Sequence, residues 1–249
     1  MTGKNSVGYK LTALGSRTFQ TFNPVENSYN ETIFVEAVSQ EIEEAVLLAS
    51  NAFEELKGIS HFKKAEFLSR IAELLTEKED LILQQYIRES GLSYERGKIE
   101  MKRTIFQLTS FSALVKENNW REVSIDLADD SRIPPKPDLR KMLFGIGPVV
   151  VFGASNFPLA YSTIGGDSVS ALAAGCPVIV KSHPLHAGTG ELVANCVIQA
   201  AKETEMPNGI FSNLNAFGFE VGESLVKHSQ IKAVGFTGSI KGGRALFDL

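Results

Sequence analysis

Cysteine and long apolar runs are scarce in this sequence, and each scarcity excludes a class of protein. Only two cysteines, Cys176 and Cys196, occur among 249 residues, which is too few for a disulfide framework. No run of about 18 apolar residues exists, so we expect no membrane-spanning segment. The opening residues, Met1 to Ser6, lack the apolar stretch of a secretory signal. We therefore expect a cytoplasmic protein with reduced thiols.

The sequence also has no excess of basic residues over acidic ones. The chain has 25 lysines and arginines against 29 aspartates and glutamates, a net charge of −4. A protein that binds a nucleic-acid backbone needs a basic face, so we expect no nucleic-acid partner and no membrane partner. Hydrophobic residues make up 43% of the chain and charged residues 22%, which is typical of a globular enzyme that acts on small molecules.

Residues 1–118 are predicted to form an N-terminal arm with short strands, followed by helices. From Ser39, which can cap the first helix, apolar residues recur at helical spacing up to Lys57-Gly58. Three further helices are expected, with approximate ranges 65–75, 81–89 and 95–116. None of the four helices contains a catalytic spacing, so this region is interpreted as scaffold.

Residues 119–144 have a different pattern. Residues 123–127 alternate like a strand, three prolines between 134 and 137 exclude regular structure, and residues 139–144 can return as a second strand. A polar, proline-interrupted excursion of this kind predicts an arm that reaches away from the core. Such an arm can pair with another subunit.

Residues 145–249 alternate between strand and helix. Apolar strands are expected at 148–152, 178–180, 210–214 and 231–236, with helices between them, including one from about Pro158 to Gly175. This order predicts an α/β fold with a Rossmann-like parallel sheet and flanking helices. Ligands of such sheets lie at the carboxyl ends of the strands, so the loops of interest are 153–158, 181–188, 215–219 and 237–239.

The turn at residues 235–239, Gly-Phe-Thr-Gly-Ser, is a candidate phosphate site. Its glycines let the backbone approach an anion, and the following helix presents unpaired N–H groups. The alternative is a plain turn in which Ser239 caps the helix. No G-x-G-x-x-G or P-loop pattern occurs in the chain.

Asn156, in the turn 153–158, is a candidate for oxyanion stabilisation, because a side-chain amide donates a hydrogen bond without adding charge. The alternative is that Asn156 caps the helix expected at Pro158. Ser155 is a weaker candidate, because the G-x-S-x-G pattern of a nucleophile elbow is absent.

Lys181 ends a strand, where it can reach a cofactor's ribose or phosphate or can simply be exposed. His183 and His186 lack a third ligand nearby, so no metal site is expected. Cys176 and Cys196 are interpreted as small buried hydrophobic residues rather than nucleophiles.

Together these segments are more specific than any one alone. Phe-Gly-Ala-Ser-Asn-Phe-Pro (152–158), Ser-Ala-Leu-Ala-Ala-Gly-Cys-Pro (170–177), a strand ending at Lys181 and Gly-Phe-Thr-Gly-Ser (235–239) occur in this order. The series resembles the aldehyde dehydrogenase superfamily over about residues 20–249. With Lys-Ser-His-Pro-Leu-His-Ala-Gly-Thr (181–189), it is most similar to the 2,5-dioxovalerate (α-ketoglutarate semialdehyde) dehydrogenases.

The resemblance implies roles for the turn residues. Asn156 matches the asparagine that helps to bind the oxyanion, Lys181 the lysine that contacts the adenosine ribose, and Gly238 and Ser239 the turn that faces the diphosphate. The same cofactor site is expected to include Ser182, His183, Pro184, Phe217, Gly218 and Thr237. By the same resemblance, residues 119–144 join subunits, so we expect a homo-oligomer at full length.

In that family a cysteine thiolate attacks the aldehyde and a glutamate activates water to hydrolyse the thioester. Both residues follow the Thr-Gly-Ser turn at a greater distance than the ten residues between Ser239 and Leu249. We therefore expect a truncated aldehyde dehydrogenase fold without its catalytic domain, and an inactive chain. The alternatives are a non-catalytic nucleotide-binding or subunit-association module and a related acyl-phosphate or acyl-thioester reductase.

Cofactor choice depends on the position three residues after Lys181. NAD-preferring members of the family often carry a glutamate there, which binds the ribose hydroxyls and repels a 2′-phosphate. This sequence has Pro184, flanked by Ser182 and His183, which could donate to a phosphate. The expected cofactor is therefore NADP or NAD with NADP favoured, and the expected substrate is a semialdehyde.

Overall fold

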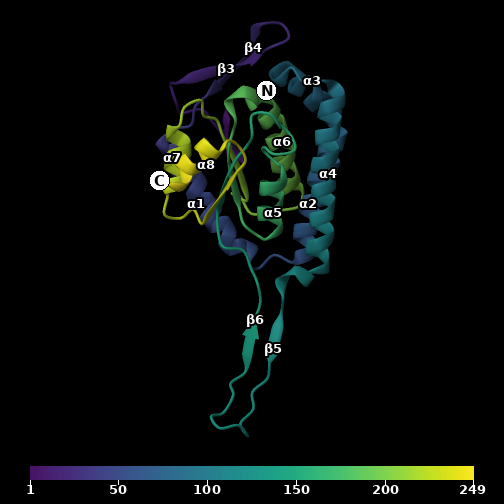
Figure 1. Ribbon diagram of the computed structural model, residues 1–249, viewed down its shortest axis with the longest axis vertical. Coiled ribbons are helices and arrows are strands. Elements are labelled where there is room, and N and C mark those ends of the chain that lie inside the picture. Colours follow the sequence, from purple (N-terminus) through teal and green to yellow (C-terminus); the bar gives the residue numbers. More distant parts are fainter.

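The computed structural model describes residues 1–249 and contains a six-stranded sheet with helices on both faces (Figure 1). The strand order is β10-β7-β8-β9-β1-β2. Four parallel strands form one side of the sheet and confirm the expected α/β core; they are β7 (Val149–Phe152), β8 (Val178–Lys181), β9 (Phe211–Leu214) and β10 (Ala233–Phe236).

The N-terminal segment corrects the expectation of a purely parallel sheet. β1 (Asn5–Val7) runs antiparallel to β9 and pairs with β2 (Lys10–Thr12). Gly8 permits the tight turn between the two strands because its φ is +53°. The side-chain oxygen of Asn5 also accepts a hydrogen bond from the N–H of Asn215 at 2.7 Å. The first residues are therefore part of a mixed sheet.

The inner parallel strands β7, β8 and β9 are buried on both faces, whereas β10, at the edge of the sheet, is partly exposed. Val149, Val151, Val178 and Val180 point into a core shared with α2 to α6, whereas Val150, Phe152 and Ile179 point into a second core with α1 and α7. This alternation follows from the two-residue period of a strand.

Four amphipathic helices precede the parallel strands, as predicted. Their bounds are α1 (Ser39–Leu56), α2 (His61–Glu77), α3 (Glu79–Ser90) and α4 (Tyr94–Glu117). The expected N-cap of α1 is shifted by one residue: Val38 is the cap, and the Glu41 side chain accepts its N–H at 3.0 Å. α3 ends at Gly91, which is left-handed with φ of +66°.

The later helices are shorter, apart from α6. They are α5 (Gly166–Ala173), α6 (Ala187–Glu203), α7 (Glu220–Lys227) and α8 (Ile240–Phe247), with single 3₁₀ turns at Asn119–Arg121 and Pro184–His186. α5 starts eight residues later than the expected helix start at Pro158, and turns fill residues 158–165. Asn156 is therefore not a helix cap, which removes the alternative role given to it above.

Two hairpins lie outside the main sheet. β3 (Thr18–Asn23) pairs with β4 (Ser28–Val35) near α3, and β5 (Ser124–Asp126) pairs with β6 (Leu139–Lys141). The second hairpin projects far from the body of the molecule (Figure 1), as expected for residues 119–144. Its Ile125, Leu127 and Leu139 side chains are exposed.

None of the helices is both long enough and apolar enough to cross a membrane.

Candidate functional site

A cleft of about 610 Å³ opens at the carboxyl ends of β7, β8 and β10. Six of the residues predicted to bind a cofactor line it: Lys181, His183, Gly218, Thr237, Gly238 and Ser239. The aromatic rings of Phe152, Phe219 and Phe236 complete its apolar walls. The ends of separate strands therefore meet at one cavity, as the topology of a parallel sheet requires.

The turn between β10 and α8 brings backbone close to the cleft. A Cβ at Gly238 would lie 2.6 Å from the Phe236 ring, so this position has no room for a side chain. Ser239 caps α8 through a hydrogen bond from the Gly242 N–H at 3.1 Å. Thr237 donates to Asp167 on α5 at 3.2 Å. The capping role proposed as an alternative for Ser239 is thus present, and the same turn lines the cleft.

Lys181 and His183 provide the polar side of the cleft. Burial lowers the pKa of Lys181 to about 8, although the nearby Glu36 carboxylate opposes the shift. Burial, with smaller effects of His186 and Lys181, lowers the pKa of His183 to about 3. His183 is therefore neutral near pH 7. Its Nδ1 accepts the Leu185 N–H at 3.3 Å, which leaves Nε2–H as a donor.

The remaining predicted cofactor residues lie beside the cleft rather than in its lining. Ser182 is buried, and its hydroxyl has no hydrogen-bond partner. Pro184 begins the 3₁₀ turn that leads into α6. Phe217 is exposed, and its ring lies 5.8 Å from that of Phe19.

Glu36 is a residue of this site that the sequence did not reveal. It is buried, and its carboxylate accepts the N–H groups of Phe217 at 2.6 Å and Gly218 at 2.9 Å. Its second oxygen pairs with Arg17 Nε at 2.7 Å, and Arg17 also pairs with Glu220 at 3.0 Å. The carboxylate thus fixes the loop that carries Gly218 to the cleft.

Replacing Glu36 by alanine is expected to speed amide hydrogen exchange at Phe217 and Gly218 by about tenfold or more. The two N–H groups lose a charged acceptor, which contributes about 1.5–3 kcal/mol in bonds of this kind. Exchange measured by NMR or mass spectrometry checks this result. Glu31→Ala, an exposed change on the neighbouring strand β4, should leave these rates unchanged.

Asn156 is exposed and borders a second cavity of about 450 Å³. This cavity is also lined by Phe157, Arg96 and His186. Ser155 lines both cavities, so the second cavity adjoins the cleft. The amide of Asn156 is accordingly placed next to, rather than inside, the cleft that holds Lys181.

The loop that carries Asn156 is fixed by α4. The Glu100 carboxylate accepts the N–H groups of Leu159 at 3.2 Å and Ala160 at 3.3 Å. It also accepts the Tyr86 hydroxyl at 2.9 Å and Arg96 Nε at 3.1 Å. Because Leu159 and Ala160 lie about 60 positions away from Glu100, the helical pattern of α4 does not reveal these two contacts.

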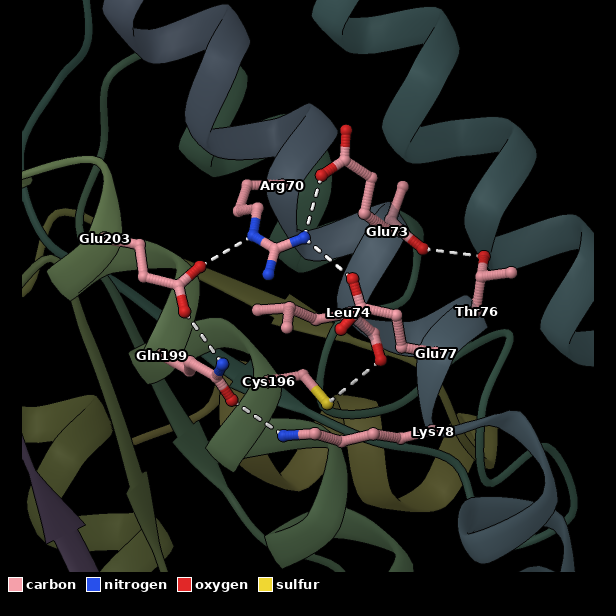
Figure 2. A network of polar contacts seen from close by, with 10 residues as sticks. Arg70, Glu73, Leu74, Thr76, Glu77, Lys78, Cys196, Gln199 and Glu203 are labelled. Atoms are coloured by element: carbon pink, nitrogen blue, oxygen red, sulfur yellow. Dashed lines mark hydrogen bonds and ion pairs between the residues drawn. The ribbon is translucent and has the colours of Figure 1, made fainter.

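Neither cysteine is placed to act as a nucleophile. Cys196 is buried in α6, and Figure 2 shows its Sγ facing the backbone oxygen of Leu74 on α2, at 3.8 Å. Burial raises the pKa of this thiol to about 11. Cys176 is buried at the amino end of β8, opposite the cleft. Both are small core residues, as predicted.

His186 also has a structural role. It is fully buried, and Nε2 lies 2.9 Å from the carbonyl oxygen of Ala154. The ring therefore supports the turn after β7, and it stacks against His183 with ring centres 5.0 Å apart.

Comparison with known proteins decides the family. Residues 12–248 match the profile of the aldehyde dehydrogenase family. The chain belongs to the aldehyde dehydrogenase family.

Among curated aldehyde dehydrogenases, two semialdehyde dehydrogenases are similar along the whole chain. Alpha-ketoglutaric semialdehyde dehydrogenase 2 of Azospirillum brasilense is 41% identical over 251 residues, which cover 100% of this chain and 48% of the relative. The alpha-ketoglutaric semialdehyde dehydrogenase of Acinetobacter baylyi is 38% identical over 248 residues, 99% of this chain and 47% of the relative. The chain thus spans about half the length of the curated relatives it matches.

Solved structures agree on the fold. Methylmalonate-semialdehyde dehydrogenase from Oceanimonas doudoroffii matches 100% of this chain and 48% of its own, with a TM-score of 0.85 and 20% identity. An NAD-dependent benzaldehyde dehydrogenase from Corynebacterium glutamicum matches 99% and 50%, with a TM-score of 0.84 and 23% identity. The resemblance identified in the sequence is confirmed.

Proposed function

We propose that this chain is the cofactor-binding part of an NAD(P)-dependent aldehyde dehydrogenase that oxidises a semialdehyde, 2,5-dioxopentanoate, to the carboxylate. The observation that carries the proposal is the cleft at the carboxyl edge of the sheet, where Lys181, His183, Gly238 and Ser239 meet. The two relatives named as alpha-ketoglutaric semialdehyde dehydrogenases support the substrate.

The residues of the cleft fit a dinucleotide. The Lys181 ammonium would hold the ribose hydroxyls, and the Nε2–H of His183 would donate beside it. The backbone of Gly238 and Ser239, at the start of α8, would hold the diphosphate, because a helix N-terminus favours anions. A bound NAD(P) supplies the hydride acceptor for aldehyde oxidation.

We propose that NADP is favoured over NAD. Pro184, three residues after Lys181, adds no negative charge that would repel a 2′-phosphate. Glu36 is buried and already paired with Arg17. Glu223 also lines the cleft, from α7, but Lys227 at 3.9 Å partly compensates its negative charge, so it adds little repulsion toward a 2′-phosphate.

Affinity for NADP is expected to fall as the pH rises through about 8. Burial lowers the pKa of free Lys181 to about 8, so the ammonium is charged below this pH and neutral above it. Bound phosphate stabilises the charged form, and binding therefore weakens as the proton is lost. Isothermal titration between pH 6.5 and 9.5 measures the effect.

Lys181→Met should lower the affinity for NADP by about tenfold and remove most of this pH dependence. Lys102→Met, an exposed change on α4, is the matched control and should behave like the unchanged chain. NADP affinity that is unaffected by Lys181→Met would place the cofactor elsewhere.

Asn156 is proposed to donate a hydrogen bond from its side-chain amide to the oxyanion formed when a nucleophile adds to the aldehyde.

Two arginines of α4 border the loop that follows Asn156. Arg96 lies 4.5 Å from the ring centre of Phe157, and Arg103 lies 5.1 Å from that of Tyr161. Arg103 has no acidic partner among the salt bridges. Arg96 is already paired with Glu100, so the Arg103 guanidinium is the charge that would attract an aldehyde carrying a carboxylate, as a semialdehyde does.

The nucleophilic cysteine and the glutamate that activates water are proposed to lie beyond Leu249. Cys176 and Cys196 are both buried. The chain alone is therefore expected to show no aldehyde-dependent formation of NADH or NADPH in an absorbance assay. Turnover that disappears in a Cys176→Ala, Cys196→Ala double variant would contradict this assignment.

Subunit association is a second candidate function, favoured by the exposed apolar residues of the β5–β6 hairpin. We propose that this hairpin joins copies of the full-length enzyme. Sedimentation of the chain with and without residues 124–141 tests this role separately from cofactor binding.

A further inference from the structure

A third cavity, of about 400 Å³, lies at the root of the β5–β6 hairpin. Figure 1 shows where this hairpin meets the body of the molecule. The walls of the cavity come from the ends of α1, α2, α4 and α5 and from both roots of the hairpin. Gly145 and Gly175, which precede β7 and β8, place it at the amino ends of the strands. It is therefore at the opposite edge of the sheet from the cofactor cleft.

The charges that line this cavity all have one sign. Lys57, Lys64 and Arg121 line it, together with His61, and no aspartate or glutamate does. This contrasts with a chain whose net charge is −4. Lys57 is neutralised by Glu54 at 2.6 Å, which leaves Lys64 and Arg121 as the relevant cations.

Lys64 and Arg121 are both half-buried and neither has a carboxylate partner. The Lys64 ammonium takes part in no salt bridge, and Arg121 donates only through Nε, to the carbonyl oxygen of Leu143 at 3.2 Å. Burial and the charge of Arg121 both lower the pKa of Lys64. Two unneutralised cations that line the same cavity repel each other, and an anion bound between them would remove that cost.

Three aromatic side chains form part of the apolar wall of this cavity. Trp120, the single tryptophan of the chain, is half-buried here, and Phe53 and Phe144 also line the cavity. A volume of about 400 Å³ lies within the range of small-molecule sites, about 300–1,000 Å³. Flat apolar groups stack on such rings.

We propose that this cavity binds a small organic anion, with a carboxylate or phosphate held by Lys64 and Arg121 and a flat apolar body packed against Trp120. The site is separate from the cofactor cleft, and its existence does not depend on the proposed dehydrogenase function. Phosphate and carboxylate share the charge that the two cations recognise, so the experiment distinguishes them.

Trp120 is the only tryptophan of the chain, so a change in tryptophan fluorescence reports directly on this site. Titration with adenosine monophosphate and, separately, with benzoate is expected to give a saturable change in emission for at least one of them. A response to the nucleotide alone assigns a phosphate ligand, and a response to benzoate alone assigns a carboxylate. Either result supports the site, and a flat response to both overturns it.

Variants connect the response to the two cations. Lys64→Met combined with Arg121→Met should weaken binding by at least about tenfold. Lys141→Met, an exposed charge on the hairpin, should leave it unchanged, as should Lys181→Met in the cofactor cleft. Circular dichroism and thermal unfolding show whether the double variant is folded; if it is not, each single variant should still weaken binding by several-fold.

Two results would contradict the proposal. Inorganic phosphate that binds as tightly as the nucleotide or benzoate would show that the aromatic wall contributes nothing. Trp120 emission that changes with protein concentration in the absence of ligand would show that a second copy of the chain covers the cavity.

Discussion

Replacing Glu100 by alanine is expected to lower the free energy of unfolding by about 3 kcal/mol. The buried carboxylate accepts the Leu159 and Ala160 N–H groups and the Tyr86 hydroxyl, and each buried donor left without an acceptor costs about 1–3 kcal/mol. Its ion pair with the partly exposed Arg96 adds less, because water screens that side chain. Urea unfolding followed by circular dichroism measures the change.

The matched control is Glu117→Ala, at the exposed end of the same helix. This substitution should change the free energy of unfolding by no more than about 0.5 kcal/mol. Equal losses from Glu100→Ala and Glu117→Ala would show that the contacts from α4 to the loop at 159–160 contribute no stability.

Replacing Asn156 by alanine is expected to reduce kcat by about 10²- to 10³-fold in an enzyme that carries this sequence together with the catalytic half. The side-chain amide would donate to charge that develops only in the transition state, so the affinity for NADP should not change. Steady-state kinetics with the semialdehyde and titration with NADP separate the two effects.

Asn51→Ala is the control for this prediction, because Asn51 is an exposed asparagine on α1 that lines neither the cofactor cleft nor the cavity beside Asn156. It should change kcat by less than about threefold. A similarly small effect of Asn156→Ala would remove Asn156 from the mechanism, while a parallel loss of NADP affinity would indicate that the turn has moved.

The fold of residues 145–249 could be predicted because the parallel strands β7, β8 and β10 are short, mostly apolar runs that each lead into a turn. The strands that end at Phe152, Lys181 and Phe236 lie within two residues of the predicted positions. Since the carboxyl ends of parallel strands share one edge, the meeting of Lys181 and Gly238 at one cleft also follows from topology.

Contacts between distant segments could not be predicted. Residues 1–12 are too polar and too short to identify as strands of the main sheet, and β1 is recognised only by its partner β9. Similarly, Glu36 and Glu100 resemble ordinary surface acids in the sequence, and they become buried through backbone N–H groups about 180 and 60 residues away. The start of α5 at Gly166 could not be predicted either, because turns held by Glu100 replace the expected first helical turns.

In the proposed function, the turns after β8, β9 and β10 together hold one dinucleotide. Hydrogen exchange of the chain with and without saturating NADP tests it most directly. We expect slower exchange at residues 181–184, 217–218 and 238–239 when NADP is bound, with no change at the hairpin 124–141. Protection confined to one of these turns, or protection at the amino edge of the sheet alone, would contradict it.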